Sequence, residues 1–239
     1  PAPADYDGDG KADIAVFRPA GATGTEWWVQ KSSGGVFATQ FGVSTDQAVP
    51  VDFTGDGKAD VAFWRPSTGE WYVLRSENNT FYAFPFGANR DVPVPADYDG
   101  DGKTDIAVWR GNTGVWFIKR SSNGATQQVI WGLSTAPYFD VPVPGDYDGD
   151  GSFDVGVWRG NVSKWYITRS SNGTLLDVNW GSSLAPYFDI PVASDYDGDG
   201  KTDIAVWRSS TGVWFVRRST DEQAFIQAHG QTGDTPIPR

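Results

Sequence analysis

Aspartate residues recur in this sequence at a spacing that suits the binding of a cation. The pattern Asp-x-Asp-Gly-Asp-Gly-x-x-Asp occupies residues 5–13, 97–105, 146–154 and 195–203, and a variant of it occupies residues 52–60. In the variant, Thr54 replaces the second aspartate. Carboxylates this close together repel one another, so a chain gathers them in one short loop where a cation lies among them. The sequence therefore predicts five metal loops.

The ligands and their number indicate calcium. An EF-hand takes carboxylates from loop positions 1, 3, 5 and 12, whereas these loops have Val or Phe at position 12 and an aspartate at position 9. All-oxygen ligands of this number favour calcium over magnesium, which needs a tighter octahedral shell. The predicted side-chain ligands are Asp5, Asp7, Asp9, Asp13, Asp52, Thr54, Asp56, Asp60, Asp97, Asp99, Asp101, Asp105, Asp146, Asp148, Asp150, Asp154, Asp195, Asp197, Asp199 and Asp203.

We expect about one Ca²⁺ per loop, five in total, and the weakest binding in the second loop, where Thr54 offers a neutral hydroxyl. The alternative is a set of Asx turns, in which backbone N–H groups satisfy the carboxylates and no metal binds. Charge favours the metal. The loops hold 19 of the 30 acidic residues, so five divalent cations would reduce the net charge from −11 to about −1.

The elements that position the loops repeat with them. Loop-opening aspartates are 47, 45, 49 and 49 residues apart. Each loop is followed by an apolar strand such as Ile106-Ala-Val-Trp-Arg110, a turn, a second strand such as Trp116-Phe-Ile118, a polar turn, and a third strand that ends in an aromatic residue and glycine. A segment such as Val92-Pro-Val-Pro95 then leads into the next loop. Four strands in this length are typical of a propeller blade.

Counting predicts an all-β fold: a single five-bladed β-propeller domain, residues 1–239, with four antiparallel strands per blade. The predicted blades are approximately residues 1–47, 48–92, 93–141, 142–190 and 191–239. One full turn takes 235 residues, so residues 1–4 repeat 236–239. We therefore expect the ring to close between the termini, with one Pro-x-Pro copy occupying the shared inner strand. Closure removes exposed sheet edges.

The loop, the strand after it and the period resemble the FG-GAP/VCBS repeats of bacterial surface and secreted proteins and the calcium-bearing blades of integrin α-subunit propellers. The resemblance covers nearly the whole chain. It implies that the loop joins the first and second strands of a blade and that the position-7 carbonyl is a ligand, which adds Lys11, Lys58, Lys103, Ser152 and Lys201. Integrin propellers have seven blades and Gly-Ala-Pro after the strand, where this chain has Arg-Pro or Arg-Gly. Integrin-type ligand binding is therefore not implied.

Residues suited to catalysis are scarce, and we do not expect an enzyme. His229 is the only histidine, and it occupies the aromatic slot that Phe41, Phe86, Trp131 and Trp180 fill in the other copies. The carboxylates outside the loops form no evident acid–base pair. The absence of cysteine excludes disulfides and thiolate chemistry.

Two sets of residues are candidates for binding. The third and fourth copies have longer loops, which bring Tyr138, Phe139, Tyr187 and Phe188 to the face opposite the metal loops. These rings either form a platform for a sugar or peptide or cap neighbouring blades. One arginine recurs after each loop: Arg18, Arg65, Arg110, Arg159 and Arg208. This set either stacks on rings and pairs with aspartates, or binds an anion or glycan.

The sequence favours a calcium-stabilised binding or adhesion module, secreted or at the cell surface, with a lectin as the sharpest version. The alternatives are a purely structural repeat domain or a non-catalytic domain of a secreted enzyme or surface protein. A glycan or an extracellular protein is the expected partner of a monomeric domain. The charge of −11 argues against nucleic acid, and no run of apolar residues is long enough to insert into a membrane. The chain opens on Pro1 and has no Met, which indicates a processed or excised fragment.

Overall fold

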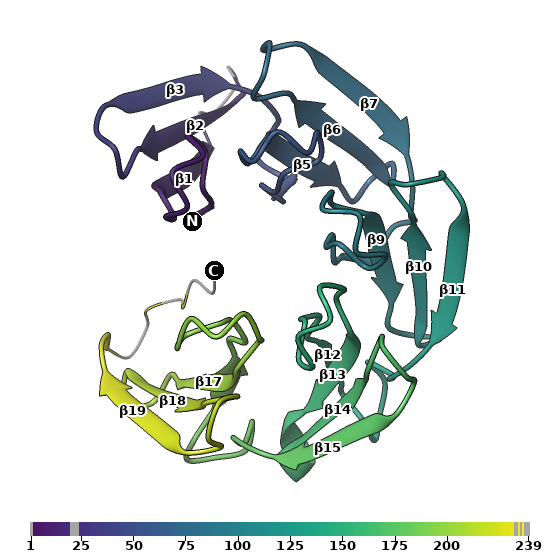
Figure 1. Ribbon diagram of the computed structural model, residues 1–239, viewed down its shortest axis with the longest axis vertical. Coiled ribbons are helices and arrows are strands. Elements are labelled where there is room, and N and C mark those ends of the chain that lie inside the picture. The colour runs from purple at the N-terminus through teal and green to yellow at the C-terminus, as the bar shows by residue number, and fades with distance from the viewer. Residues whose placement is uncertain (1, 20–23, 232–233, 235, 237–239) are drawn as a thin grey trace.

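The structure of the protein is a computed structural model that describes residues 2–19, 24–231, 234 and 236. It confirms the predicted β-propeller: five antiparallel sheets follow one another around a central axis (Figure 1). A single 3-10 turn, η2 (Gly160–Val162), is the one helix in the described part of the chain. No helix among the described residues is long and apolar enough to cross a membrane.

Each blade runs from the axis outward in chain order. The first contains β1 (Ile14–Pro19), β2 (Thr25–Gln30) and β3 (Val36–Gln40), and the second contains β4 (Gln47–Ala48), β5 (Val61–Arg65), β6 (Glu70–Leu74) and β7 (Phe81–Pro85). The third contains β8 (Val92–Pro93), β9 (Ile106–Arg110), β10 (Val115–Lys119) and β11 (Thr126–Ile130). The fourth contains β12 (Val141–Pro142), β13 (Val155–Arg159), β14 (Lys164–Thr168) and β15 (Leu175–Asn179), and the fifth β16 (Asp189–Pro191), β17 (Ile204–Arg208), β18 (Val213–Arg217) and β19 (Ala224–Ala228).

The side chains explain which strands lie inside. In β10, alternate residues point to opposite faces, so Trp116 and Ile118 are buried while Phe117 is half-exposed. In β9, Ala107, Val108 and Trp109 are all buried, as the apolar run predicts for a strand covered on both faces. The two tryptophans pair across the strands, with ring centroids 6.2 Å apart. Aromatic residues are cross-strand partners at the same two positions in every blade, and their rings are also in contact in the first and fourth blades.

Backbone hydrogen bonds link successive blades at the metal loops. The amide at loop position 8 donates to the position-1 carbonyl of the preceding loop, as from Ala59 to Asp5 at 2.6 Å and from Phe153 to Asp97 at 2.7 Å. Thr104 and Thr202 make the same bond. These four bonds connect the five loops to one another in chain order.

Ring closure concerns the junction between the first and fifth blades, whose ribbons lie on the same side of the ring in Figure 1 but are separated from each other. The first blade has its inner segment from the N-terminal copy: the Ala2 amide donates to the Ala15 carbonyl at 3.0 Å, and Ala4 bridges to Asp13. Most of the C-terminal copy, residues 236–239, lies outside the described residues. Closure between the termini therefore stays a prediction.

Candidate metal loops

Each acidic loop joins the inner strand of a blade to the next strand, as the family resemblance implied. The third loop is representative: it leaves β8, enters β9, and is closed by a bridge between Ala96 and Asp105. Its two glycines have positive φ angles, 72° at Gly100 and 82° at Gly102, which residues with a Cβ rarely adopt. The fold therefore turns the loop back on itself, so that its carboxylates face a common centre.

The position-1 aspartate shapes the loop through its own backbone. Asp97 accepts N–H bonds from Gly100 at 2.7 Å, Asp101 at 3.3 Å and Gly102 at 2.8 Å. The other loops repeat this network with little change. The Asx-turn alternative thus describes position 1 correctly, and it accounts for the shape of the loop without an ion.

The position-3 aspartate shows what an Asx turn leaves unexplained. One oxygen of Asp99 accepts the Ser122 hydroxyl at 2.5 Å, but the other, Oδ1, is buried without a partner. Oδ1 of Asp7 and of Asp148 is equally buried and unpartnered. A buried unsatisfied polar group costs about 1–3 kcal/mol, and more when it is charged. A cation at the centre of the loop would satisfy these oxygens, so the residues present fit a metal.

The aspartates at positions 5 and 9 bind the loop to the polar turn at the end of the second strand after it, which is β10 in the third blade. Asp101 accepts the Ser121 hydroxyl at 2.7 Å. Asp105 is fully buried and accepts the amides of Tyr98 at 2.9 Å and Ser121 at 2.7 Å. These bonds recur in all five blades. The position-9 carboxylate therefore braces the blade, whether or not it is also a ligand.

The carboxylates gather closely in four of the five loops. In each, one ligand oxygen from each of three aspartates lies within 4.8 Å of the other two: Asp5, Asp7 and Asp13; Asp97, Asp99 and Asp101; Asp146, Asp148 and Asp154; Asp195, Asp197 and Asp199. No three acidic side chains meet in this way in the second loop, all of whose residues are described. The difference follows from Thr54, which supplies no carboxylate.

Burial raises the pKa of the position-9 carboxyls Asp60, Asp105, Asp154 and Asp203 above their ordinary value, and a neighbouring loop carboxylate acts in the same direction. Hydrogen bonds have the opposite effect at position 5 of the first loop, where the Ser32 hydroxyl and then the Lys11 amide lower the pKa of Asp9. The buried ends of the second, third, fourth and fifth loops thus resist negative charge when no cation is present.

Stabilisation by calcium is expected to shrink as the pH falls from 7 toward the ordinary carboxyl pKa of about 4. In the metal-free protein, the raised pKa of the position-9 groups makes their contribution to stability largest at low pH, and it is lost as the pH rises through that pKa. Calcium instead requires ionised ligands, so protons compete with it. Melting with calcium and with EDTA at several pH values measures the difference. A calcium-induced rise in Tm that stays constant from pH 7 to pH 5 would contradict this expectation.

On the opposite face, the recurring arginines form ion pairs. The Arg110 guanidinium donates two bonds to the buried Asp91 carboxylate, at 2.8 and 2.9 Å, and lies 4.6 Å from the centre of the Phe117 ring. Arg65, Arg159 and Arg208 pair in the same way with Asp46, Asp140 and Asp189. Arg18 lies over Trp28, at 5.6 Å. The interpretation of these arginines as paired and stacked residues is confirmed for these four pairs.

The two longer loops, residues 136–140 and 185–189, each contain a tyrosine and a phenylalanine with different surroundings. Tyr138 and Tyr187 lie over Arg159 and Arg208, at 4.3 and 4.4 Å, and so cap the neighbouring blades. Phe139 and Phe188 are instead 58% and 51% exposed. Both have positive φ, 52° and 50°, which is strained for a bulky residue. Stacking on arginine supports the capping interpretation for the tyrosines, which are also 38% and 44% exposed, and binding of a ligand by any of the four rings stays a prediction.

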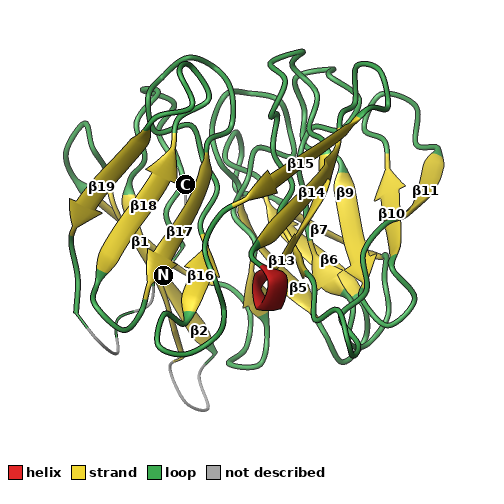
Figure 2. Ribbon diagram, turned by 90° about the horizontal axis from the view of Figure 1, so that it is seen from below, coloured by secondary structure: helices red, strands yellow, loops and turns green. Residues whose placement is uncertain are grey.

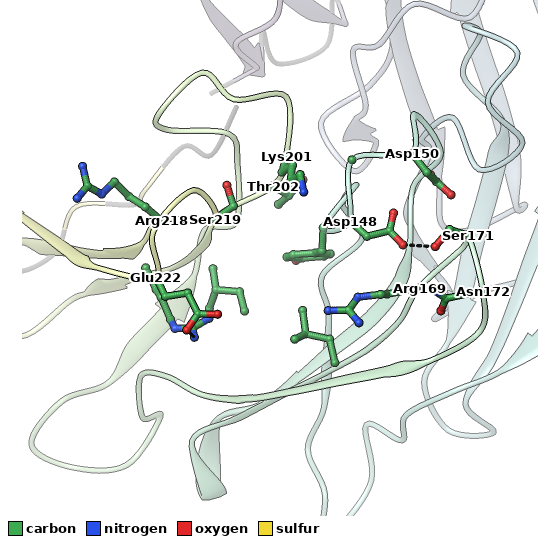
Figure 3. Close-up of a pocket in the computed structure, with 15 residues that line it drawn as sticks. Asp148, Asp150, Arg169, Ser171, Asn172, Lys201, Thr202, Arg218, Ser219 and Glu222 are labelled. Carbon is green, nitrogen blue, oxygen red and sulfur yellow. Dashed lines mark hydrogen bonds and ion pairs between the residues drawn. The ribbon is translucent and has the colours of Figure 1, made fainter.

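A groove of about 510 Å³ lies between the fourth and fifth blades, on the side of the metal loops. Figure 3 shows the side chains that line it. Asp148, Arg169, Lys201 and Arg218 line it. An equivalent groove of about 300 Å³, between the third and fourth blades, contains Arg120 and Arg169. The Nε atoms of Arg120, Arg169 and Arg218 are buried without a hydrogen-bond partner. The sequence analysis did not single out these arginines, although an arginine stands just before the polar turn in four of the five blades and Lys31 stands there in the first.

His229 takes the position that the repeat assigns to it. Its amide donates to Gly212 at 2.9 Å and its carbonyl accepts the Trp214 indole at 3.0 Å. Trp131 makes the same two bonds, with Gly114 and Trp116. The backbone of His229 therefore has a structural role.

Comparison with known proteins identifies the repeat. The family model described as "FG-GAP-like repeat" matches residues 5–63, 52–108 and 97–157. No curated protein sequence matches the chain significantly. Similar solved structures include a streptogramin B lyase, the BBS1N chain from a complex with ARL6DN, and the dihydro-heme d1 dehydrogenase NirN, each with a TM-score of 0.51 and 12%, 13% and 13% identity. Matching regions cover 89%, 95% and 93% of this chain and 67%, 67% and 54% of those chains. At this identity, the likeness concerns the fold alone.

Proposed function

Because the chain belongs to the FG-GAP-like repeat family, we propose that it is a calcium-stabilised binding or adhesion module that works outside the cell. The observation that carries the proposal is the buried, unpartnered Oδ1 of Asp7, Asp99 and Asp148. These three atoms recur at one loop position in three blades, so they reflect a common requirement. A hard cation with oxygen ligands meets that requirement.

In this proposal, positions 1, 3, 5 and 9 and the position-7 carbonyl hold the ion. Calcium would supply charge neutralisation and a fixed centre for each loop. The chain already does the rest: its glycines turn the loop, its serines orient the carboxylates, and the backbone bond between neighbouring loops carries the order to the next blade. The role of the metal is structural, and five ions would stabilise the ring as a whole.

An extracellular location suits these sites. Calcium sites of extracellular modules have dissociation constants of about 10⁻⁴–10⁻³ M. The cytosol does not supply free calcium at such concentrations. FG-GAP repeats are typical of extracellular proteins, which agrees with this chemistry. A cytosolic protein with five such loops would remain metal-free and would carry a net charge of −11 without compensation.

A binding role, with a glycan as the sharpest case, is supported by the face opposite the metal. Phe139 and Phe188 recur at equivalent positions of the longer loops, and both are exposed in a strained backbone conformation. The loops are anchored, since Asn161 donates to the Pro137 carbonyl and Ser209 to that of Phe188, each at 2.8 Å. Rigid exposed rings of this kind bind sugars or peptides with little loss of entropy.

We propose no catalytic role. The structural neighbours include a lyase and a dehydrogenase, but they share only the fold with this chain. Its loop carboxylates are held by backbone amides and hydroxyls, and His229 occupies a structural slot. If no ligand exists for the exposed rings, the remaining proposal is a purely structural repeat domain or a non-catalytic accessory domain.

A glycan array followed by tryptophan fluorescence titration tests the binding role. A sugar that binds the wild type is expected to bind Phe139→Ala/Phe188→Ala about tenfold or more weakly, because buried aromatic anchors contribute over 1 kcal/mol each to binding. Phe225→Ala is the control, since Phe225 is also an exposed phenylalanine but lies on the outer strand β19. A flat response across a broad glycan panel would remove the lectin proposal and leave the structural one.

A further inference from the structure

The position-3 carboxylate of a metal loop has a hydroxyl partner from the polar turn that follows the next strand but one. Asp99 accepts the Ser122 hydroxyl at 2.5 Å, and Asp197 accepts the Thr220 hydroxyl at 2.7 Å. Asp7 and Asp148 have the same partner type, in Ser33 and Ser171. Four blades thus combine an acid on the loop with a hydroxyl on the turn.

The second blade has the same two groups in exchanged positions. Thr54, a hydroxyl, replaces the loop aspartate, and Glu77, an acid, stands where the turn has serine or threonine. We infer that Glu77 supplies to the second metal site the carboxylate that Thr54 lacks. The inference rests on the proposed calcium function, and it concerns which residues complete one of its sites.

The backbone places Glu77 where its counterparts lie. Ser76, just before it, donates its amide to Asp60 at 2.8 Å and its hydroxyl to Asp56 at 2.9 Å, as Ser121 does with the matching aspartates of the third loop. The turn has the same hydrogen bonds in both blades, from Arg75 to Thr80 at 2.9 Å and from Arg120 to Ala125 at 2.9 Å. The Cβ atom of Glu77 therefore starts from the position that Ser122 occupies in the third blade.

The length of the side chain suits the exchange. A glutamate reaches two bonds beyond a serine, and in the other blades a hydrogen bond of ordinary length spans that gap to the loop carboxylate. A carboxylate on the turn can thus occupy nearly the same space as a carboxylate on the loop. The hydroxyl of Thr54 remains on the loop side, where it already lies 3.4 Å from Asp52.

Glu77 is weakly held in its present orientation. Its carboxylate lies 4.0 Å from Arg75 Nε and 3.5 Å from the Asn78 amide nitrogen, and its side chain is 48% exposed. Arg75 has other partners, because it stacks on Tyr82 at 4.6 Å and donates to Thr80 at 3.2 Å. An exposed ion pair of this length contributes about 0–1 kcal/mol, so little opposes rotation of Glu77 toward a bound cation.

The exchange restores the charge of the second site. With Glu77, the second loop has four carboxylates, as each of the other loops has. This revises the expectation that the second site binds calcium least tightly, since that expectation counted only Thr54. The structure thus explains why one departure in the loop coincides with one departure in the turn, 23 residues later.

Native mass spectrometry and calorimetric titration with calcium test the inference. The wild type is expected to bind five ions. Glu77→Gln is expected to retain four at unchanged affinity and to bind the fifth at least tenfold more weakly, and adding Thr54→Asp is expected to restore it. Glu70→Gln is the matched control, because Glu70 lies in the same blade but binds Thr68 and Tyr72 on the opposite face.

Moving the threonine–glutamate combination of the second blade into the third blade provides a test that does not depend on the folding of the Glu77 variant. Asp99→Thr is expected to remove the third site, and Asp99→Thr/Ser122→Glu to restore it. The inference is overturned if Glu77→Gln binds five ions as the wild type does, or if the wild type itself binds only four. A wild type that binds no calcium would instead refute the proposed function, and the two failures are therefore distinguishable.

Discussion

Excess EDTA is expected to lower the melting temperature of the calcium-loaded protein by about 15–30 °C. A ligand at ten times its dissociation constant stabilises the folded state by about 1.4 kcal/mol per site, so five sites contribute about 7 kcal/mol. In a domain of this size, each kcal/mol corresponds to about 2–4 °C. The reason lies in the loops: without an ion, the position-3 aspartates Asp7, Asp99 and Asp148 each keep an unpaired buried oxygen beside like charges.

Circular dichroism melts in calcium, in EDTA, and in EDTA followed by excess calcium measure this effect and its reversal. Magnesium in place of calcium is the control for ionic strength and for a general divalent effect, and it is expected to restore much less of the melting temperature. An unchanged melting temperature in excess EDTA would show that the Asx-turn interpretation is sufficient and that the loops need no metal.

Asp91→Ala is expected to reduce the free energy of unfolding by about 2–3 kcal/mol, because it removes a buried carboxylate that accepts hydrogen bonds from a half-exposed guanidinium and from a backbone amide. Asp91 is 4% exposed, accepts both Arg110 bonds, and also accepts the Ala88 amide at 2.8 Å. Its loss leaves the Ala88 amide and the half-exposed Arg110 guanidinium without their carboxylate partner at the end of the third blade. Urea denaturation of wild type and variant in saturating calcium measures the difference.

Asp177→Ala provides the comparison for this variant. Asp177 also forms an ion pair, with Lys164 at 2.6 Å, but both side chains are over 30% exposed. Exposed pairs of this kind contribute at most about 1 kcal/mol. If the two variants lose the same stability, burial of the Asp91 carboxylate does not strengthen the recurring arginine–aspartate pair.

Periodicity made most of the fold predictable from sequence. Because the loop recurs every 45–49 residues, each strand of the unit can be compared in five copies. A residue that is ambiguous in one copy is then assigned from the others. His229 is an example: its backbone makes the bonds that its place in the repeat predicted, although the residue is exposed, unlike the half-buried Trp131. The loop glycines and carboxylates were predictable for the same reason, since their chemistry depends on neighbours within nine residues.

Contacts between distant turns were not predictable in the same way. The bond between Ser122 and Asp99 joins residues that are 23 positions apart. It forms only in one register of the two strands between them, and that register cannot be read from the sequence. The exchange of Thr54 and Glu77 was therefore seen only as a weakened loop. Similarly, the sequence left open whether Arg110 binds an anion, and the structure shows that it pairs with Asp91.

We propose above all that five loops hold calcium and that these ions stabilise the propeller. Anomalous diffraction from crystals grown in calcium tests it most directly. We expect one anomalous peak in each loop, beside Oδ1 of the position-3 aspartates Asp7, Asp99, Asp148 and Asp197, and beside Glu77 in the second blade. Well-ordered loops without any such peak, in crystals grown in millimolar calcium, would contradict the account.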